Sequence, residues 1–171
     1  MIIPNSIFTY LHFSNPTEEQ KIALQSMESF VQKENQDDFM ILCGAAGTGK
    51  TSITSALIGY LNESNSPYKI AAPTGRAARI LGKKAKTCTS TIHSMIYLVT
   101  SNKETGAVSL NLKNTTDSTP VIYIVDEASM IPKNANTEDE LFHTERGLMF
   151  DLIHYVKRAN VNNKIIFLGD F

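Results

Sequence analysis

The chain has 171 residues, of which 42% are hydrophobic and 19% charged, a composition that indicates one soluble globular domain with a sizeable core. Its formal net charge of −1 excludes a surface that is basic all over, so any contact with nucleic acid must be local. The two distant cysteines fit neither a disulfide framework nor a zinc site, and the chain lacks a membrane-spanning run and a signal peptide, so we expect a cytoplasmic protein with no membrane partner.

The first predicted helix begins in the segment 15–18. Asn15 is expected as the N-cap, Pro16 at the first helical position and Glu18 at the capping-box position. A mostly helical apolar stripe then extends to about Lys33, and its members are Ile22, Leu24, Met27, Phe30 and Val31.

A strand, a glycine-rich loop and a helix are predicted next. The apolar run Phe39–Cys43 indicates a parallel strand buried on both faces, with Cys43 as a buried thiol. The following loop matches the complete pattern G-x-x-x-x-G-K-[ST], and a helix is expected from Lys50 to about Leu61. Because the strand and the helix flank the loop, a chance glycine-rich turn is strongly disfavoured.

This loop is predicted to bind the phosphates of ATP. Its glycines allow backbone N–H groups to surround phosphate oxygens at a helix N-terminus. Lys50 would reach the β- and γ-phosphates, and the Thr51 hydroxyl would bind Mg²⁺. The predicted ATP-binding residues of the loop are Gly44, Ala45, Ala46, Gly47, Thr48, Gly49, Lys50 and Thr51.

The middle of the chain continues the alternation of strands and helices. Tyr68–Ala72 predicts a strand, the residues 73–75 a turn, and the segment from Arg76 to about Lys84 a helix. Residues 87–97 predict a short strand followed by a short helix. Alternating apolar residues and a polar tip with a glycine over 98–114 predict a β-hairpin.

Two acidic residues follow the next strand, Val121–Val125. One of the carboxylates, Asp126, could hold Mg²⁺, and the adjacent Glu127 could polarise the attacking water. The alternative is that Asp126 caps the following helix and Glu127 is solvated. Beside a complete phosphate loop we favour the catalytic interpretation, with Lys50 as the third catalytic residue.

The chain ends with a helix predicted from Glu145 to about Ala159 and a strand predicted over Lys164–Leu168. Strands that alternate with helices predict an α/β fold with a doubly wound, mainly parallel sheet and right-handed crossovers. Ligands bind beyond the carboxyl ends of the strands of such sheets. The segments expected at that edge are Gly44 onward, Pro73-Thr74, Asp126-Glu127 and Gly169-Asp170.

The order of these motifs resembles the first RecA-like domain of superfamily 1 DNA helicases, and the RecD-like and Dda-like branch most. The resemblance rests on six segments in family order. They are similar to the Q motif (Asn15–Gln20), motif I (Gly44–Thr51), motif Ia (Ala72–Ala78), motif Ib (Ser90–Ser94), motif II (Asp126–Ser129) and the start of motif III (Leu168–Asp170).

This resemblance implies roles for further residues. Gln20 would hydrogen-bond the adenine of ATP, although an exposed glutamine on a helix surface is the common alternative. His93 would lie on the DNA side, or else be a satisfied core histidine. The residues implied in binding single-stranded DNA are Pro73, Thr74, Gly75, Arg76, Thr91 and His93. Arg76, Arg79, Lys83, Lys84 and Lys86 could alternatively form a solvated basic helix face.

The resemblance also implies a domain organisation. Residues 1–171 would form a single N-terminal RecA-like domain (domain 1A), with a small 1B-like hairpin insertion around 98–114 that separates strands or is a plain surface hairpin. Its predicted tip, 100–106, has no aromatic residue to stack on bases. The second RecA-like domain would be absent, so we expect little ATPase activity and no unwinding from these residues alone.

For the full-length protein, the resemblance implies an ATP-dependent helicase that moves 5′ to 3′ on single-stranded DNA. It would act in repair or recombination, with ATP and Mg²⁺ as its cofactors. Two other hypotheses remain from the sequence. One is an ATP-dependent DNA-binding or clamp subunit without unwinding activity. The other is a P-loop nucleoside kinase, which would need a second substrate pocket.

Overall fold

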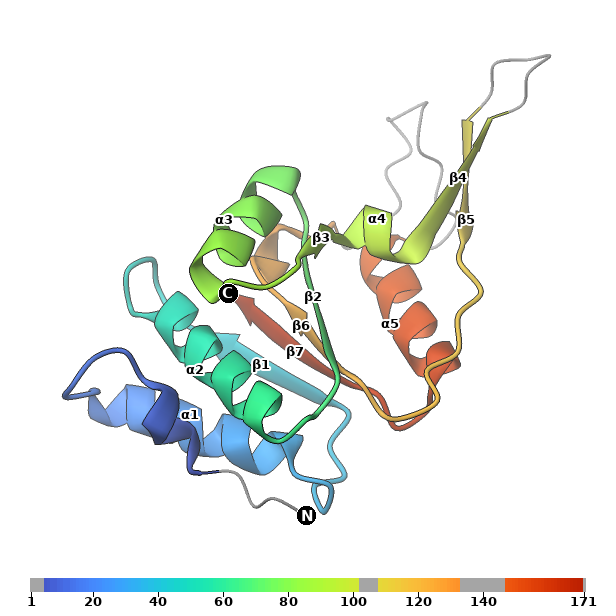
Figure 1. Ribbon diagram of the computed structural model, residues 1–171. Coiled ribbons are helices and arrows are strands. Elements are labelled where there is room, and N and C mark those ends of the chain that lie inside the picture. Colours follow the sequence, from blue (N-terminus) through green and yellow to red (C-terminus); the bar gives the residue numbers. More distant parts are fainter. Residues whose placement is uncertain (1–4, 102–107, 133–146, 171) are drawn as a thin grey trace.

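The hydrophobic strands pair in parallel, and helices cover both faces of the sheet that they form (Figure 1). The computed structural model describes residues 5–101, 108–132 and 147–170. The sheet has five strands in the order β1-β7-β6-β2-β3, and a two-stranded antiparallel hairpin, β4-β5, projects from it. The predicted α/β fold, with a doubly wound parallel sheet and a small inserted hairpin, is therefore confirmed. The strands are β1 (Phe39–Cys43), β2 (Tyr68–Ala72), β3 (Ser90–Thr91), β4 (Tyr97–Ser101), β5 (Val108–Leu112), β6 (Ile122–Val125) and β7 (Lys164–Gly169).

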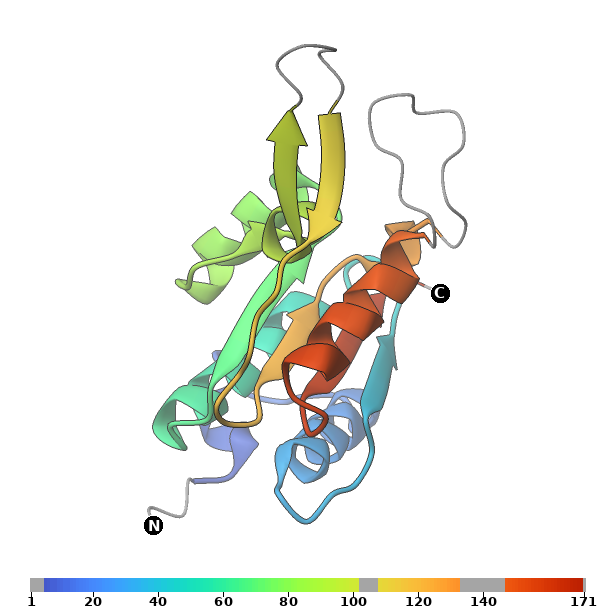
Figure 2. The same ribbon diagram turned by 90° about the vertical axis from the view of Figure 1, so that its right-hand side faces the viewer.

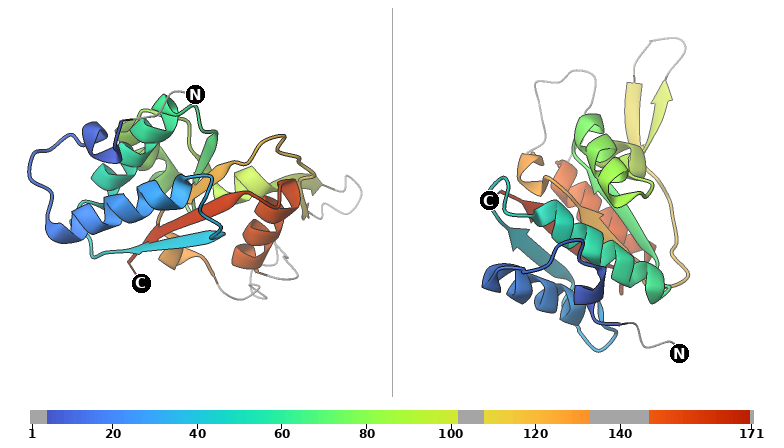
Figure 3. Two further views of the ribbon diagram at one scale, coloured as in Figure 1. Left: turned by 90° about the horizontal axis from the view of Figure 1, so that it is seen from below. Right: turned by 60° about the vertical axis from the view of Figure 1, so that its left-hand side comes forward.

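The helices form two layers. One layer consists of η1, α1, α2 and α3, and the other contains α4 and α5; Figure 2 shows α5 in front of the sheet with α1 and α2 behind it. Figure 3 shows α1 running alongside β1, and α1 also packs against α2. No helix among the described residues combines the length and apolar character needed to cross a membrane. The helices are η1 (Ile7–Tyr10), α1 (Glu18–Val31), α2 (Lys50–Glu63), α3 (Gly75–Ala85), α4 (Ile92–Ile96), η2 (Ala128–Met130) and α5 (Leu148–Ala159).

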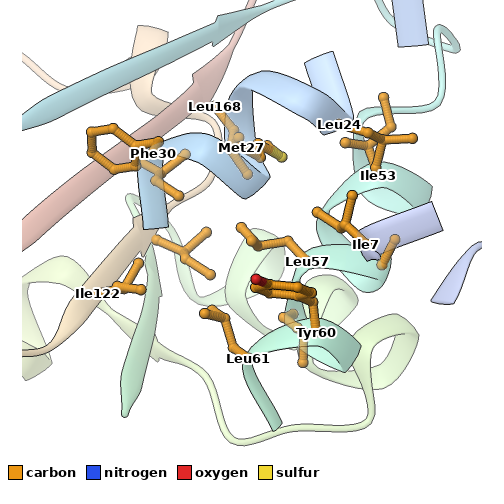
Figure 4. Close-up of a cluster of buried hydrophobic side chains, with 14 of the residues drawn as sticks. Ile7, Leu24, Met27, Phe30, Ile53, Leu57, Tyr60, Leu61, Ile122 and Leu168 are labelled. Atoms are coloured by element: carbon orange, nitrogen blue, oxygen red, sulfur yellow. The ribbon is translucent and has the colours of Figure 1, made fainter. Parts of the chain in front are cut away.

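Alternation along the central strands builds two hydrophobic cores. In β6, Ile122 and Ile124 point into the core under α1 and α2, whereas Tyr123 and Val125 point into the core under α5. Successive side chains of a strand face opposite sides of a sheet, so an all-apolar strand is the pattern that two covered faces require. Figure 4 shows the first core, where Leu57 and Leu61 of α2 meet side chains of α1 and the sheet.

The edge position of β1 contradicts one prediction. β1 was expected to be buried on both faces, but Phe39 is 43% exposed, Ile41 is 61% exposed, and Cys43 is exposed as well. The prediction of a buried thiol is wrong for the same reason. The core under α5 takes its strand residues from the region around β2, β6 and β7, so the outward face of β1 lies beyond the cover of that helix. The ring of Phe167 stacks on Phe39 at 6.4 Å between centroids, and the ammonium group of Lys157 lies 5.7 Å from the centre of the Phe39 ring.

The start of α1 also differs from the prediction. The N-cap is Thr17 and not Asn15, because the Thr17 hydroxyl accepts a hydrogen bond from the backbone N–H of Gln20 at 3.2 Å. The capping-box partner is Gln20 and not Glu18, and its Oε1 accepts from the Thr17 N–H at 3.0 Å. Asn15 adopts a positive φ of 92° and therefore lies in the turn before the helix.

A partly buried polar cluster joins three strands at their amino ends. Asp117 accepts hydrogen bonds from Lys69 of β2 at 2.8 Å, from Tyr123 of β6 at 2.7 Å and from Asn163 beside β7 at 2.9 Å. Burial by itself raises the pKa of Asp117, but these hydrogen bonds and the charge of Lys69 outweigh it, so the pKa lies below its ordinary value. The ionised carboxylate therefore stabilises the folded state.

We predict that Asp117→Asn removes part of the acid sensitivity of folding. A lowered folded-state pKa gives stability that is present above the unfolded pKa of about 3.9 and is lost as the pH falls through the folded value. At pH 7 the free energy of unfolding of the variant should be lower by about 1–3 kcal/mol, because the donors of Lys69, Tyr123 and Asn163 lose a charged acceptor. Urea unfolding at pH 7 and at lower pH should show a flatter pH dependence than wild type. Parallel curves would contradict this assignment, and Asp37→Asn, at an exposed aspartate, is the control.

The base of the hairpin contacts α5 through a buried hydrogen bond between two side chains. The Tyr97 hydroxyl, at the start of β4, donates to Oδ2 of Asp151 at 2.6 Å, and Asp151 is only 8% exposed in the first turn of α5. Burial and this hydrogen bond to a carboxylate both raise the pKa of Tyr97. The contact therefore fixes the hairpin to the helical layer of the domain.

We predict that Tyr97→Phe destabilises the fold by about 1–3 kcal/mol, because Asp151 would remain buried without its donor. Urea unfolding monitored by circular dichroism measures the change. Tyr68→Phe is a matched control, since the Tyr68 hydroxyl donates to Asn62 at the surface and its loss should cost within about 0.5 kcal/mol. Equal losses from both variants would refute the anchoring role.

Candidate nucleotide-binding site

Parallel pairing brings the predicted site segments to one edge of the sheet. The segments meet there in strand order: the phosphate loop after β1, Asp170 after β7, Asp126 after β6, the turn 73–76 after β2, and His93 beyond β3. Neighbouring strands lie about 4.8 Å apart, so the four spacings from β1 to β3 extend over roughly 19 Å. This edge can therefore hold two neighbouring functions, one at the end near β1 and one at the end near β3.

The phosphate loop has a backbone that only glycine adopts without strain. Gly47 and Gly49 have positive φ values of 85° and 92°, and a Cβ on Gly44 would lie 2.8 Å from the hydroxyl of Thr48. The Thr48 hydroxyl in turn donates to the carbonyl of Ala45 at 2.8 Å. Residues 45–48 are exposed, so the loop is open to an incoming ligand at the N-terminus of α2.

Lys50 begins α2 and points back along the loop. Its ammonium group donates to the carbonyls of Gly44 and Ala45, the latter at 3.1 Å, and to the carboxylate of Asp170. The side chain of Lys50 is only 15% exposed. The predicted phosphate-binding lysine therefore lies inside the loop with a protein carboxylate as one partner.

Gln20 lies against the phosphate loop. Its Nε2 donates to the carbonyl of Thr48 at 2.9 Å, while its Oε1 accepts from Thr17. A Cβ on Gly49 would approach that Nε2 to 2.9 Å, so the amide and the loop are packed closely. Gln20 thus links the cap of α1 to the nucleotide site and is not a plain surface residue; its contact with adenine stays a prediction.

The carboxylates after β6 precede a short 3-10 helix, η2. The N-cap of η2 is Glu127, whose side chain makes no capping hydrogen bond. The N-cap position is therefore Glu127 and not Asp126. Both residues are partly buried, and Glu127 has a positive φ of 52°, a conformation that a side chain other than Gly, Asn or Asp rarely adopts. This local strain at the end of β6 is typical of a functional position.

The donor chemistry of the site suits Mg²⁺ bound together with a nucleotide. The hydroxyl of Thr51 and the carboxylate of Asp126 are hard oxygen ligands. Across the described ranges no three His, Cys, Asp or Glu side chains gather to hold a metal on their own. Mg²⁺ commonly binds through one or two protein oxygens plus substrate phosphates, which is the set available here.

The turn after β2 carries the predicted motif Ia residues. The Thr74 hydroxyl caps α3 by accepting from the N–H of Ala77 at 3.2 Å, and Thr74, Gly75 and Arg76 are all exposed, with Pro73 partly buried beside them. The exposed side chains of α3 continue the basic surface with Arg79, Lys83 and Lys86, whereas the Lys84 side chain lies outside the described residues. An exposed helix N-terminus beside a basic surface is a suitable phosphate-binding arrangement.

The residues after β3 are also at the surface. Thr91 caps α4 by accepting from the N–H of Ser94 at 3.1 Å, and His93 is exposed with its ring 5.8 Å from that of Tyr97. The alternative of a core histidine is therefore wrong. Partial burial lowers the pKa of His93, which keeps the imidazole neutral at physiological pH.

Asp170 is the residue of the site whose role the sequence does not predict. It follows a buried strand, which places it at the ligand edge, but its pairing with Lys50 requires that β7 lie directly beside β1. That neighbourhood is a property of the strand order, because residues 50 and 170 are far apart in the chain. The sequence does show a carboxylate directly after a predicted buried strand, and this pattern indicates that Asp170 lies at the ligand edge of the sheet.

Comparisons with known proteins identify the family of the domain. A family model described as an AAA domain matches residues 27–171. No curated protein matches the sequence. Two solved structures are similar: the large terminase from a thermophilic bacteriophage (14% identity, TM-score 0.45, 91% of this chain and 39% of that one) and the Phi-28 gp11 DNA packaging motor (12%, 0.37, 80% and 47%). The chain thus spans less than half the length of these two proteins, and similarity at this level carries no argument about function.

We predict that Lys50→Ala weakens MgATP binding by about 10- to 100-fold or more while the protein stays folded, since charge-assisted hydrogen bonds to phosphate are lost. Titration calorimetry gives the affinity, and circular dichroism checks the fold. Lys21→Ala is the control, because Lys21 pairs with Glu18 on the exposed face of α1. Unchanged affinity in the Lys50 variant would contradict its role.

Proposed function

This chain belongs to the AAA domain family of P-loop ATPases, and from that premise we propose that it is the ATP-binding and ATP-hydrolysing domain of a helicase that moves along single-stranded DNA. One observation carries the proposal. The phosphate loop and the exposed, basic N-terminal turn of α3 lie on the same edge of one sheet, separated by β7 and β6. Two sites on the same edge of one sheet can be coupled through the backbone hydrogen bonds of the strands between them.

The nucleotide half of the site supplies the groups that phosphoryl transfer requires. The loop amides and Lys50 would bind the β- and γ-phosphates, and Thr51 and Asp126 would hold Mg²⁺, which neutralises charge on the phosphates. Glu127 would orient and polarise the attacking water. Gln20, packed on the loop, would contact the adenine or report on loop position.

The DNA half would bind the sugar–phosphate backbone and not read bases. Thr74, Gly75 and Arg76 would contact phosphates, with Thr91 and His93 farther along the same edge. A direct link joins the halves: the backbone N–H of Asp126 donates to the carbonyl of Ala71 at 3.0 Å, and Ala71 lies two residues before the turn after β2. A shift at the end of β6 would therefore move the DNA-binding turn.

The remaining parts of the proposed motor are the hairpin and a partner domain. The β4-β5 hairpin would be the 1B-like insertion, and its base at Tyr97 is held by Asp151. A second RecA-like domain of the full-length protein would supply the arginines of the transition state, whose absence typically costs about 10³–10⁵ in rate. We therefore expect slow turnover without that domain; 5′-to-3′ movement rests on the resemblance to the RecD-like and Dda-like branch.

We predict that Arg76→Ala weakens binding to single-stranded DNA and lowers the slope of log K against log salt by about 0.7, the value for one lost phosphate contact on a single strand. Fluorescence anisotropy with a labelled oligothymidine at several salt concentrations measures both quantities. Lys33→Ala removes an equal charge near the opposite edge of the sheet and should leave the slope unchanged. An unaltered slope for Arg76→Ala would mean that α3 is a solvated basic helix.

A further inference from the structure

Within the described residues, the ammonium group of Lys50 uses all of its hydrogen-bond donors. It carries three N–H donors, and its three partners are the carbonyls of Gly44 and Ala45 and the carboxylate of Asp170. A phosphate that binds Lys50 must therefore replace or share one of these partners. The effect of nucleotide binding on the rest of the domain depends on which of these three partners the phosphate displaces.

Asp170 is the partner that a phosphate displaces most easily. The two carbonyls belong to the loop itself, whereas Asp170 comes from the end of β7, and its side chain is 46% exposed. Water can solvate the released carboxylate at little cost, and a phosphate close to it would add like-charge repulsion. The carbonyls, in contrast, are held in place by the loop backbone, which includes the hydrogen bond from the Gly44 N–H to the Gly169 carbonyl at 3.2 Å.

We propose that Asp170 is a positioning residue of the nucleotide site: it pairs with Lys50 and competes with an incoming phosphate for that lysine. This inference rests on the ATP binding proposed above. Asp170 keeps the lysine folded into the loop, and it lowers nucleotide affinity by the free energy of the exchanged ion pair. Asp170 directly follows β7, which lies between β1 and β6. Its release would therefore also connect the state of the phosphate site to β6, the strand that Asp126 follows.

The competition between Asp170 and a phosphate for Lys50 does not require Mg²⁺, so ADP binding can be measured without the metal. Asp170→Asn keeps the shape of the side chain and removes its charge, so it should tighten binding of ADP in excess EDTA by about 3- to 10-fold, between the effect of an exposed ion pair and that of a hydrogen bond to a charged group. Asp170→Glu keeps the charge and should bind ADP with close to wild-type affinity. A purely structural role would instead weaken binding in both variants.

The deciding experiment is a double-mutant cycle on ADP affinity, measured by titration calorimetry in EDTA and again with Mg²⁺, on wild type, Asp170→Asn, Lys50→Ala and the double variant. The gain from Asp170→Asn should disappear in the Lys50→Ala background, because the carboxylate then has no lysine to withhold. The gain should be present with and without Mg²⁺.

Asp38→Asn is the matched control. Asp38 pairs with Lys157 near the amino ends of the strands, and the side chains are 56% and 22% exposed, close to the values for the Asp170 pair. This variant should leave ADP affinity unchanged. Affinity that is unchanged or weaker in Asp170→Asn, or a gain that persists without Lys50, would overturn the inference while the proposed function stands. If wild type binds no nucleotide, both fall together.

Discussion

Parallel pairing of the five strands places all their carboxyl ends on one edge, and each predicted site segment of this chain except Gln20 lies at such an end. The order β1-β7-β6-β2-β3 then decides which segments are neighbours. The phosphate loop, Asp170 and Asp126 fall on three consecutive strands, and the exposed turn before α3 comes on the fourth. No loop has to reach across the molecule to complete the site, because the backbone hydrogen bonds of the sheet already fix these spacings.

Two buried polar contacts keep the rest of the domain in register with that edge. At the amino ends, Asp117 connects β2, β6 and the residue before β7, so the strands that carry the site cannot slide past one another without breaking a charged cluster. On the far side of the sheet, Tyr97 and Asp151 attach the hairpin to α5. Each contact joins segments that are distant in the chain, and each leaves a buried group unsatisfied if it breaks.

The lysine of the phosphate loop donates hydrogen bonds to two carbonyls of that loop. Gln20 contacts the loop from α1, and Asp170 contacts Lys50 from the position directly after β7, so two separate elements touch the same loop. Under the proposed competition, a nucleotide that binds Lys50 would change the surroundings of β7, and the neighbouring strand β6 is followed by Asp126. The loop is thus connected to the sheet through a charge pair and not only through the chain.

Local patterns in the sequence were enough for most of the helices and strands and for the position of the predicted site segments at one edge of the sheet. The glycine-rich loop, the carboxylates after an apolar strand and the alternating hairpin depend on residues close together in the chain, so their chemistry is visible in the order of the letters. One error arose because the outcome depended on tertiary neighbours: Cys43 and Ile41 are exposed because β1 is an edge strand. The error at the start of α1 was a local one, because Thr17 and Gln20, three residues apart, form a capping box that competes with the one expected at Asn15.

By itself, therefore, the sequence determined that this chain is an α/β P-loop domain with a phosphate loop, an acidic pair and a hairpin. Only the tertiary structure decided which strand lies at the edge, that His93 is exposed, and that Asp170 meets Lys50. The reason is physical: hydrophobic period and turn chemistry are encoded over a few residues, whereas strand order results from packing the whole sheet between its helices. A contact between residues 50 and 170 exists only once that packing is complete.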